Sequence, residues 1–267
     1  MLIRGALAVV TGASSGIGRA TAVELAARGA TVVAVARREE LLREVVAEIG
    51  GGRASYLVCD VADSEAVSRT AARVLAEHGR IDVLVNNAGT PLHRAFMDCS
   101  VAELGRVMQV NYMGTVHWMR AALPAMVARG RGAVVNVAST AGAVPWTWEA
   151  GYSASKAAVI ALTEAVAPEL ARAGVHCGWV NPGLVRTEIF SEEALRHVPP
   201  GVQRSFLEPA AVARAIAGVV EHERAGVTVP RVMGLPPLVR SLLPRFYRGG
   251  LRRTYEGTLR RDRSADA

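Results

Sequence analysis

The chain has 267 residues, 51% of them hydrophobic, which suits one large α/β domain or two small ones with a sizeable core. No apolar run reaches the length of a membrane span, and the first residues lead directly into a glycine-rich turn, so we expect neither a transmembrane helix nor a signal peptide. The formal net charge is +7, but no aromatic–basic interleaving or known binding motif accompanies it, so we expect no nucleic-acid partner.

The first predicted strand, residues 6–10, is an apolar run that ends in the glycine-rich stretch TGASSGIG at residues 11–18. A helical pattern follows through Arg28. A strand, a glycine turn and a helix in this order are the context of a phosphate-binding loop, because glycines let the backbone approach a pyrophosphate and the helix N-terminus supplies amide donors. The spacing is GxxxGxG rather than GxGxxG. The stretch therefore predicts a dinucleotide site.

The second predicted strand, residues 31–36, is followed directly by Arg37 and Arg38. In dinucleotide-binding folds an acid near the end of this strand binds the ribose hydroxyls, whereas an arginine accommodates a 2′-phosphate. Here the strand ends in Ala36 and the acid is missing. The alternative is that the two arginines only begin an exposed helix. We favour the phosphate interpretation, with Arg37 as the principal contact, and expect NADP(H) rather than NAD(H).

The strand–helix alternation continues to about residue 230. Asp60 and Val61 follow the third strand, and the sequence NNAG, which ends at Gly89, follows the fourth. Asn111 lies in the middle of a long predicted helix, where a poor helix former needs a packing or a functional reason, and the sequence leaves that choice open. The further predicted elements are strands 54–59, 81–85, 133–138, 175–180 and 227–229, and helices 63–78, about 100–129, 152 to about 174, and 209–221.

Tyr152 and Lys156 are four residues apart in a predicted helix, so they lie on one face of it. A nearby cation lowers the pKa of a phenol, which makes an acid/base near neutrality. Lys156 is the only lysine in the chain, and Ser139 stands at the end of a buried strand, where its hydroxyl could polarise a carbonyl. The alternative is a surface lysine retained by chance, since YxxxK alone is a common pattern.

Residues 184–207 form a mixed amphipathic segment, broken by Pro199, Pro200 and Gly201, that suits a substrate lid. Its apolar residues, together with Trp146 and Trp148, indicate a bulky apolar substrate, unless the tryptophans only pack the loop. The apolar residues of the segment are Leu184, Val185, Ile189, Phe190 and Leu195.

Seven strand–helix repeats imply an α/β fold, a Rossmann-type doubly wound parallel sheet of seven strands. We expect one catalytic domain over residues 1–230 and a C-terminal extension over residues 231–267.

Taken together, TGASSGIG, NNAG, Asn111, Ser139, YSASK and NPG resemble the short-chain dehydrogenase/reductase family over roughly residues 5–230. The resemblance implies a catalytic set in which Tyr152 exchanges a proton with the substrate oxygen. Lys156 would lower the tyrosine pKa and bind the nicotinamide ribose, Ser139 would position the carbonyl, and Asn111 would hold a water. The implied cofactor-binding residues are Gly12, Ser14, Ser15, Gly16, Ile17, Gly18, Arg37, Arg38, Asp60, Val61, Asn87, Ala88, Gly89, Tyr152, Lys156, Pro182, Gly183, Val185 and Thr187, with no metal.

The resemblance therefore implies an NADP(H)-dependent oxidoreductase that interconverts a secondary alcohol and a ketone. The substrate would be a bulky apolar small molecule, such as a lipid, a steroid or a polyketide. Three alternatives stay open: a non-catalytic dinucleotide-binding sensor or scaffold, a module that acts at a membrane surface or on nucleic acid through the basic extension, and an epimerase or dehydratase. The first alternative predicts damage to the Ser-Tyr-Lys set, and the sequence has none.

The C-terminal extension departs from the family pattern, so a tetramer of the usual kind is in doubt and we expect a homodimer or a homotetramer. From Arg224 onward arginines greatly outnumber acids and interleave with apolar residues, while Pro236, Pro237 and Pro244 argue against one long helix. Three interpretations stay open: a subunit interface or pocket cover, a peripheral membrane contact, and disorder.

The cysteines and histidines carry no site signal. Cys59, Cys99 and Cys177 lie in apolar contexts, and we expect buried, reduced thiols of a cytoplasmic protein. The six histidines are dispersed, and no two of them stand at the spacing of metal ligands.

Overall fold

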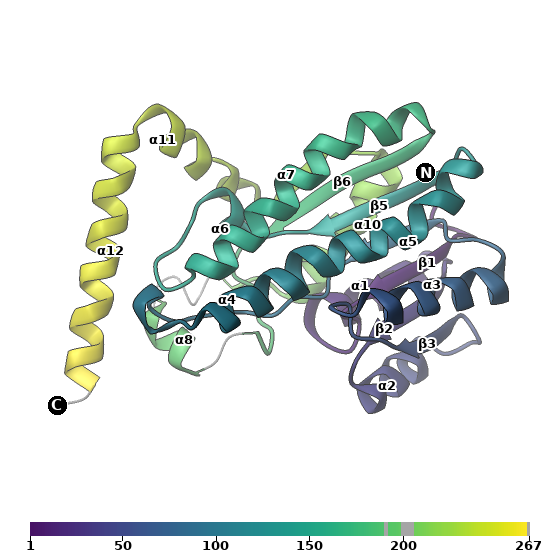
Figure 1. Cartoon of the computed structure of the whole chain (residues 1–267), viewed down its shortest axis with the longest axis horizontal. Coiled ribbons are helices and arrows are strands. Elements are labelled where there is room, and N and C mark those ends of the chain that lie inside the picture. The colour runs from purple at the N-terminus through teal and green to yellow at the C-terminus, as the bar shows by residue number, and fades with distance from the viewer. Residues whose placement is uncertain (190–191, 199–205, 266–267) are drawn as a thin grey trace.

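A computed structural model of the chain describes residues 1–189, 192–198 and 206–265. Seven parallel strands form one sheet in the order β3-β2-β1-β4-β5-β6-β7 (Figure 1). Their bounds are β1 Leu7–Thr11, β2 Thr31–Ala36, β3 Ala54–Val58, β4 Val83–Asn86, β5 Gly132–Val137, β6 Val175–Pro182 and β7 Gly226–Val229. The order reverses between β1 and β4, and in such folds ligands bind at this point, in the crevice outside the carboxyl ends of the strands.

Helices cover both faces of the sheet, which explains why its strands are continuous apolar runs. In β1, Ala8 and Val10 pack in one hydrophobic cluster and Leu7 and Val9 in another, because successive side chains of a strand point to opposite faces. The first cluster includes residues of α1 (Gly16–Ala27), α2 (Glu39–Ile49) and α10 (Pro209–His222). The second includes residues of α3 (Ser64–His78), α5 (Gly114–Ala128) and α7 (Ala150–Arg172). The predicted doubly wound fold is confirmed.

The predicted helix over about 100–129 is interrupted. It consists of α4 (Val101–Met108), one π-helical turn, η2 (Gln109–Met113), and α5. Asn111 lies in the π turn, and such turns appear mostly at functional sites. The strand predictions are right to within one or two residues, and β6 extends to Pro182 because it pairs there with Val229 of β7.

The C-terminal extension is helical in its described part. A short 3-10 turn, η3 (Arg231–Gly234), leads to α11 (Pro236–Leu242), and α12 (Pro244–Ala265) begins at the proline expected to break the helix. Figure 1 shows α12, in yellow, standing apart from the sheet on the side of α6 (Thr140–Ala143) and α8 (Glu192–His197). Within the described ranges, no helix is both long and apolar enough to cross a membrane.

Candidate active site

The glycine turn after β1 is packed too closely for side chains. Gly12 has a φ of +64°, and a Cβ placed on it would lie 2.7 Å from the Cα of Ala88. A Cβ on Gly18 would overlap the carbonyl oxygen of Gly12. The turn can therefore bring its backbone close to a ligand. Helix α1 begins without a hydrogen bond from a capping side chain or an acid in its first turn, so its first amides remain available to an anion.

Asn87 and Thr11 join the two strands on either side of the crevice. The Asn87 amide nitrogen donates to the carbonyl oxygens of Thr11 at 3.0 Å and Gly12 at 3.3 Å. The Thr11 hydroxyl accepts hydrogen bonds from the backbone nitrogens of Asn87 and Ala88, both at 3.0 Å. The NNAG stretch thus holds the glycine turn in place, a role that the sequence analysis did not assign to it.

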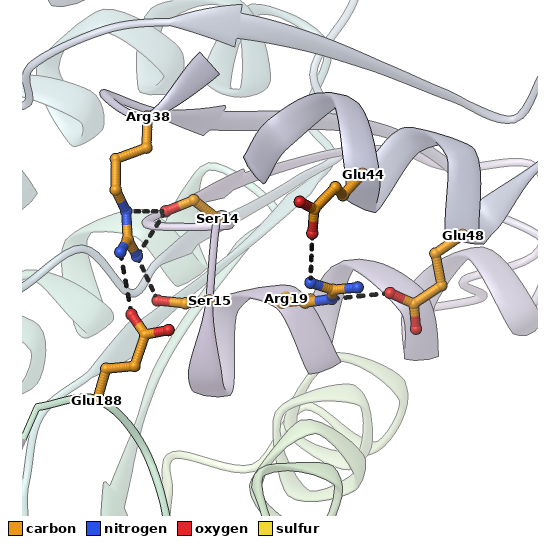
Figure 2. A network of polar contacts seen from close by, with 7 residues as sticks. All are labelled: Ser14, Ser15, Arg19, Arg38, Glu44, Glu48 and Glu188. Atoms are coloured by element: carbon orange, nitrogen blue, oxygen red, sulfur yellow. Dashed lines mark hydrogen bonds and ion pairs between the residues drawn. The ribbon is translucent and has the colours of Figure 1, made fainter. Parts of the chain in front are cut away.

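Of the two arginines after β2, Arg38 rather than Arg37 contacts the glycine turn. Arg37 is 66% exposed and makes an ion pair with Asp60 at 3.8 Å. Arg38 instead turns toward the glycine turn, where its guanidinium donates to Ser15 Oγ at 2.6 Å and to Ser14 Oγ at 3.2 Å (Figure 2). Its third partner is Glu188, at 3.0 Å, in the segment after β6. The expectation that Arg37 is the principal arginine of this site therefore does not fit the geometry.

Helix α7 brings Tyr152 and Lys156 to the same place as Ser139, as the spacing predicted. The Lys156 ammonium lies 5.8 Å from the centroid of the Tyr152 ring and donates to the carbonyl oxygen of Val137 at 2.9 Å. Lys156 is only 4% exposed, so it is not a surface lysine. Ser139 caps the short helix α6, accepting from the backbone nitrogen of Ala141 at 3.1 Å, and its side chain lies close enough to Tyr152 to lower the pKa of that phenol.

The protonation of the pair differs from the expectation. Burial raises the pKa of Tyr152 far above its usual range, the carboxylate of Glu149 raises it further, and the hydrogen bond with Ser139 lowers it. Burial also lowers the pKa of Lys156 to about 8. The expected lowering of the tyrosine pKa is therefore not found, because removal of the phenol from water raises it.

Asn111 is fixed beside this group by its amide. The side-chain oxygen accepts from the backbone nitrogen of Thr90 at 2.7 Å, and the side-chain nitrogen donates to Thr90 O at 3.1 Å and to Ser155 Oγ at 2.9 Å. A Cβ on Gly89 would lie 3.4 Å from Asn111 Oδ1 and 3.5 Å from Lys156 Nζ, so the two side chains face the same glycine. Both polar atoms of the Asn111 amide are thus engaged, which fixes the orientation of its side chain.

The remaining predicted cofactor residues lie around the same crevice. Asp60 makes ion pairs with Arg37 and Arg106. Burial raises the pKa of its carboxyl group, but a backbone hydrogen bond from Ala62 and the two arginines lower it more, so the net pKa is lowered. In the segment after β6, Val185 bridges to Leu207, and the Thr187 side chain would meet a Cβ on Gly16 at 2.9 Å. Phe190 and the Pro199–Pro200–Gly201 break fall outside the described residues.

Two histidines that are 104 residues apart in sequence meet above the N-terminus of α7, which the sequence analysis missed. His93 Nε2 lies 2.7 Å from His197 Nδ1 of helix α8, and His93 Nδ1 lies 3.4 Å from a carboxylate oxygen of Glu149. The Trp148 ring packs on His197, with centroids 4.7 Å apart, and on Tyr255 of α12, at 6.0 Å. Trp148 therefore belongs to this cluster, while Trp146 is exposed. Helix α8 and the extension thus both contact the loop before Tyr152.

A family model described as short chain dehydrogenase matches residues 6–196. A 3-oxoacyl-[acyl-carrier-protein] reductase of Thermotoga maritima is 34% identical over 237 residues, covering 85% of this chain and 95% of that protein. Among solved structures, a metagenomic short-chain oxidoreductase in complex with NADP has a TM-score of 0.71 and 36% identity, covering 82% and 92% of the two chains. An actinorhodin polyketide ketoreductase with NADPH has a TM-score of 0.79 and 32% identity, covering 86% and 97%.

Proposed function

The chain belongs to the short-chain dehydrogenase family, and on this premise we propose that it is an NADP(H)-dependent oxidoreductase that interconverts a ketone and a secondary alcohol. The observation that carries the proposal is the convergence of Ser139, Tyr152 and Lys156 at the carboxyl edge of the sheet, in a chain whose close-packed glycine turn after β1 suits a pyrophosphate. The complete set argues against a non-catalytic sensor.

The residues of the crevice fit the chemistry of NADP(H). The close-packed Gly12 and Gly18 and the uncapped start of α1 suit the pyrophosphate. At the end of β2, Arg38 lies with the hydroxyls of Ser14 and Ser15, which together suit a 2′-phosphate. Arg37 adds positive charge next to it. Since a charged hydrogen bond contributes about 1.5–3 kcal/mol, NADPH binds at least tenfold more tightly than NADH.

The protein groups perform the proton transfer. When bound, the nicotinamide supplies or accepts the hydride. The raised pKa keeps Tyr152 protonated at neutral pH, so its hydroxyl is ready to donate a proton to a ketone oxygen that Ser139 orients. The phenolate that remains is stabilised by the Lys156 ammonium.

A bulky apolar substrate fits the apolar residues of the segment after β6. Leu184, Ile189 and Leu195 are partly buried in the segment after β6, and Val185 is buried. Two of the similar proteins are named as a 3-oxoacyl-[acyl-carrier-protein] reductase and a polyketide ketoreductase. We assign a substrate of that kind, bulky and largely apolar, to this chain.

A panel of ketones with NADPH tests the proposal. We expect oxidation of NADPH with bulky apolar ketones, such as steroid, polyketide-like and long-chain 3-oxoacyl compounds, and little with small polar ones. The same panel with Tyr152→Phe controls for contaminating activity. If the unmodified protein binds NADPH but does not oxidise it in the presence of any ketone of the panel, the result would instead support the non-catalytic alternative.

A further inference from the structure

We propose that Glu188 is a specificity-determining residue of the cofactor site: its carboxylate occupies the anion position beside Arg38, and the 2′-phosphate of NADP(H) must displace it. The inference rests on the proposed function, because it concerns the same crevice. It adds a competition between the protein's own carboxylate and the ligand phosphate.

The contact joins two distant parts of the fold. Glu188 lies just after β6, 150 residues from Arg38, and its Oε2 accepts a hydrogen bond from Arg38 Nη1 at 3.0 Å (Figure 2). The Thr187 side chain lies against Gly16, and Val185 bridges to Leu207. Glu188 is therefore held over the glycine turn by its own neighbours as well as by its charge.

Arg38 is already arranged as an anion site. The hydroxyls of Ser14 and Ser15 accept from its Nη2 at 3.2 and 2.6 Å, and Ser14 also accepts from its Nε at 3.4 Å. Because these hydroxyls serve as acceptors, each keeps its own hydrogen for another oxygen. A guanidinium and two hydroxyl donors match a phosphate better than they match one carboxylate, which leaves the two hydroxyls without an acceptor among these contacts.

The two cofactors must respond differently to this arrangement. NAD(H) has no 2′-phosphate, so it can bind while the Glu188–Arg38 pair persists. NADP(H) brings a dianion to the same guanidinium, where the Glu188 carboxylate repels the phosphate and competes with it for the same donors. Glu188 therefore weakens NADP(H) binding selectively, and cofactor binding releases residues 185–189 from the glycine turn. An exposed ion pair such as Glu188–Arg38 contributes little free energy, and the repulsion between Glu188 and the phosphate adds to it. We therefore expect Glu188 to lower the affinity for NADP(H) by about three- to tenfold.

The structure offers a matched control. Arg19 of α1 makes ion pairs with Glu44 at 3.3 Å and Glu48 at 2.8 Å, also drawn in Figure 2. The side chain of Glu44 is 57% exposed and that of Glu188 67% exposed, so Glu44→Gln removes the same charge from a similar environment away from the cofactor phosphate.

The test is calorimetric titration of NADP⁺ and NAD⁺ into the full chain, which measures binding without turnover. Glu188→Gln should bind NADP⁺ about three- to tenfold more tightly and NAD⁺ within a factor of about two of the unmodified protein. Glu44→Gln and Glu188→Asp should change neither affinity. Raising the salt concentration should shrink the gain, because the charges are exposed.

A double-variant cycle with Arg38→Ala locates the effect. Alone, this variant should lose tenfold or more in NADP⁺ affinity, while Arg37→Ala loses less. In the Arg38→Ala background, Glu188→Gln should have a smaller effect, because the guanidinium that holds the carboxylate beside the phosphate is gone. A gain that is undiminished there, a gain equal for NAD⁺ and NADP⁺, or no gain at all in the presence of Arg38 would overturn the inference. Absence of any NADP⁺ binding by the unmodified protein would overturn the proposed function instead.

Discussion

At the carboxyl edge of the sheet polar side chains are buried, whereas in the C-terminal extension apolar side chains are exposed. Asn86, Asn111, Ser139 and Lys156 are each less than 10% exposed. After residue 230, in contrast, Leu238, Leu242, Leu243 and Phe246 are all more than half exposed. Both arrangements oppose the usual distribution of residues, and each needs its own explanation.

The two regions differ in where their partners lie. The edge pairs several of its polar groups within the protein: Asn136 accepts from Asn86 at 2.9 Å and donates to Thr163 at 2.9 Å, which links β4, β5 and α7, while the side-chain oxygens of Asn86 and Asn181 are buried without a partner among the described residues. In the described part of the extension, anchoring contacts include Arg240 to Ala143 O at 2.8 Å and Tyr247 to Pro145 O at 3.1 Å. A buried polar network fixes geometry, while an exposed apolar surface leaves its partner open.

The largest expected effect is the loss of turnover when Tyr152 or Lys156, at the carboxyl edge of the sheet, is replaced. Tyr152→Phe should lower kcat by about 10²–10⁴-fold, because it removes the proton donor, and should leave the Kd of NADPH nearly unchanged. Lys156→Arg should also lose most activity although it keeps the charge, since a guanidinium does not replace a compact ammonium in a buried site. Steady-state kinetics and titration of NADPH measure both. A Tyr152→Phe variant with near-normal turnover contradicts the mechanism.

Burial of Lys156 should appear as a pH dependence of stability. Its pKa is lowered from 10.5 to about 8, so the folded protein loses the proton between these values while the unfolded chain keeps it. The free energy of unfolding contributed by this group therefore rises with pH over that window, by about 3 kcal/mol in total. Lys156→Met should lack the rise and gain stability at neutral pH. Urea unfolding of both proteins from pH 7 to 10 gives the difference, and parallel pH curves would contradict it.

The pairing of polar groups at the edge is tested by Asn136, which is fully buried. Asn136→Ala should lower the free energy of unfolding by about 1–3 kcal/mol, because the Asn86 amide then has no partner inside the protein. The double replacement Asn86→Val with Asn136→Val should recover part of the loss, since both polar groups are removed. Urea midpoints at unchanged m-value measure the two effects. A double variant less stable than the sum of the single changes would contradict the pairing.

The smallest effect on the edge should come from removing the extension. Deletion after Gly234 should change NADPH affinity by less than about twofold, because the contacts of the extension are with the 143–148 loop and α8 rather than with the glycine turn. The same deletion should change self-association or binding to anionic vesicles, which light scattering and vesicle flotation measure. A tenfold loss of NADPH affinity would show that the two regions are not separable.

The sequence was sufficient where the signal is local. Apolar runs and glycine turns located all seven strands, and the YxxxK spacing brought Tyr152 and Lys156 to one helix face. Contacts between distant segments were not predictable: neither the His93–His197 contact nor the Glu188–Arg38 pair leaves any periodicity in the chain. The raised pKa of Tyr152 was also missed, because burial depends on the whole packed pocket. The choice of Arg37 over Arg38 as the principal contact was wrong for a similar reason. The path of the backbone after β2 decides which of the two side chains faces the glycine turn, and the sequence does not show that path.

The placement of Lys156 has a consequence for chemical labelling. It is the only lysine in the chain, so apart from the chain's amino terminus there is no other amine for an acylating or aldehyde reagent to modify. Apart from the histidines, every other basic side chain of the chain is an arginine guanidinium, which such reagents leave unchanged. With its pKa near 8, about half of Lys156 is the reactive free amine at that pH. A small amine-selective probe would thus act as a reporter of access to the catalytic crevice, and occupancy by NADP(H) would be read as protection of a single site.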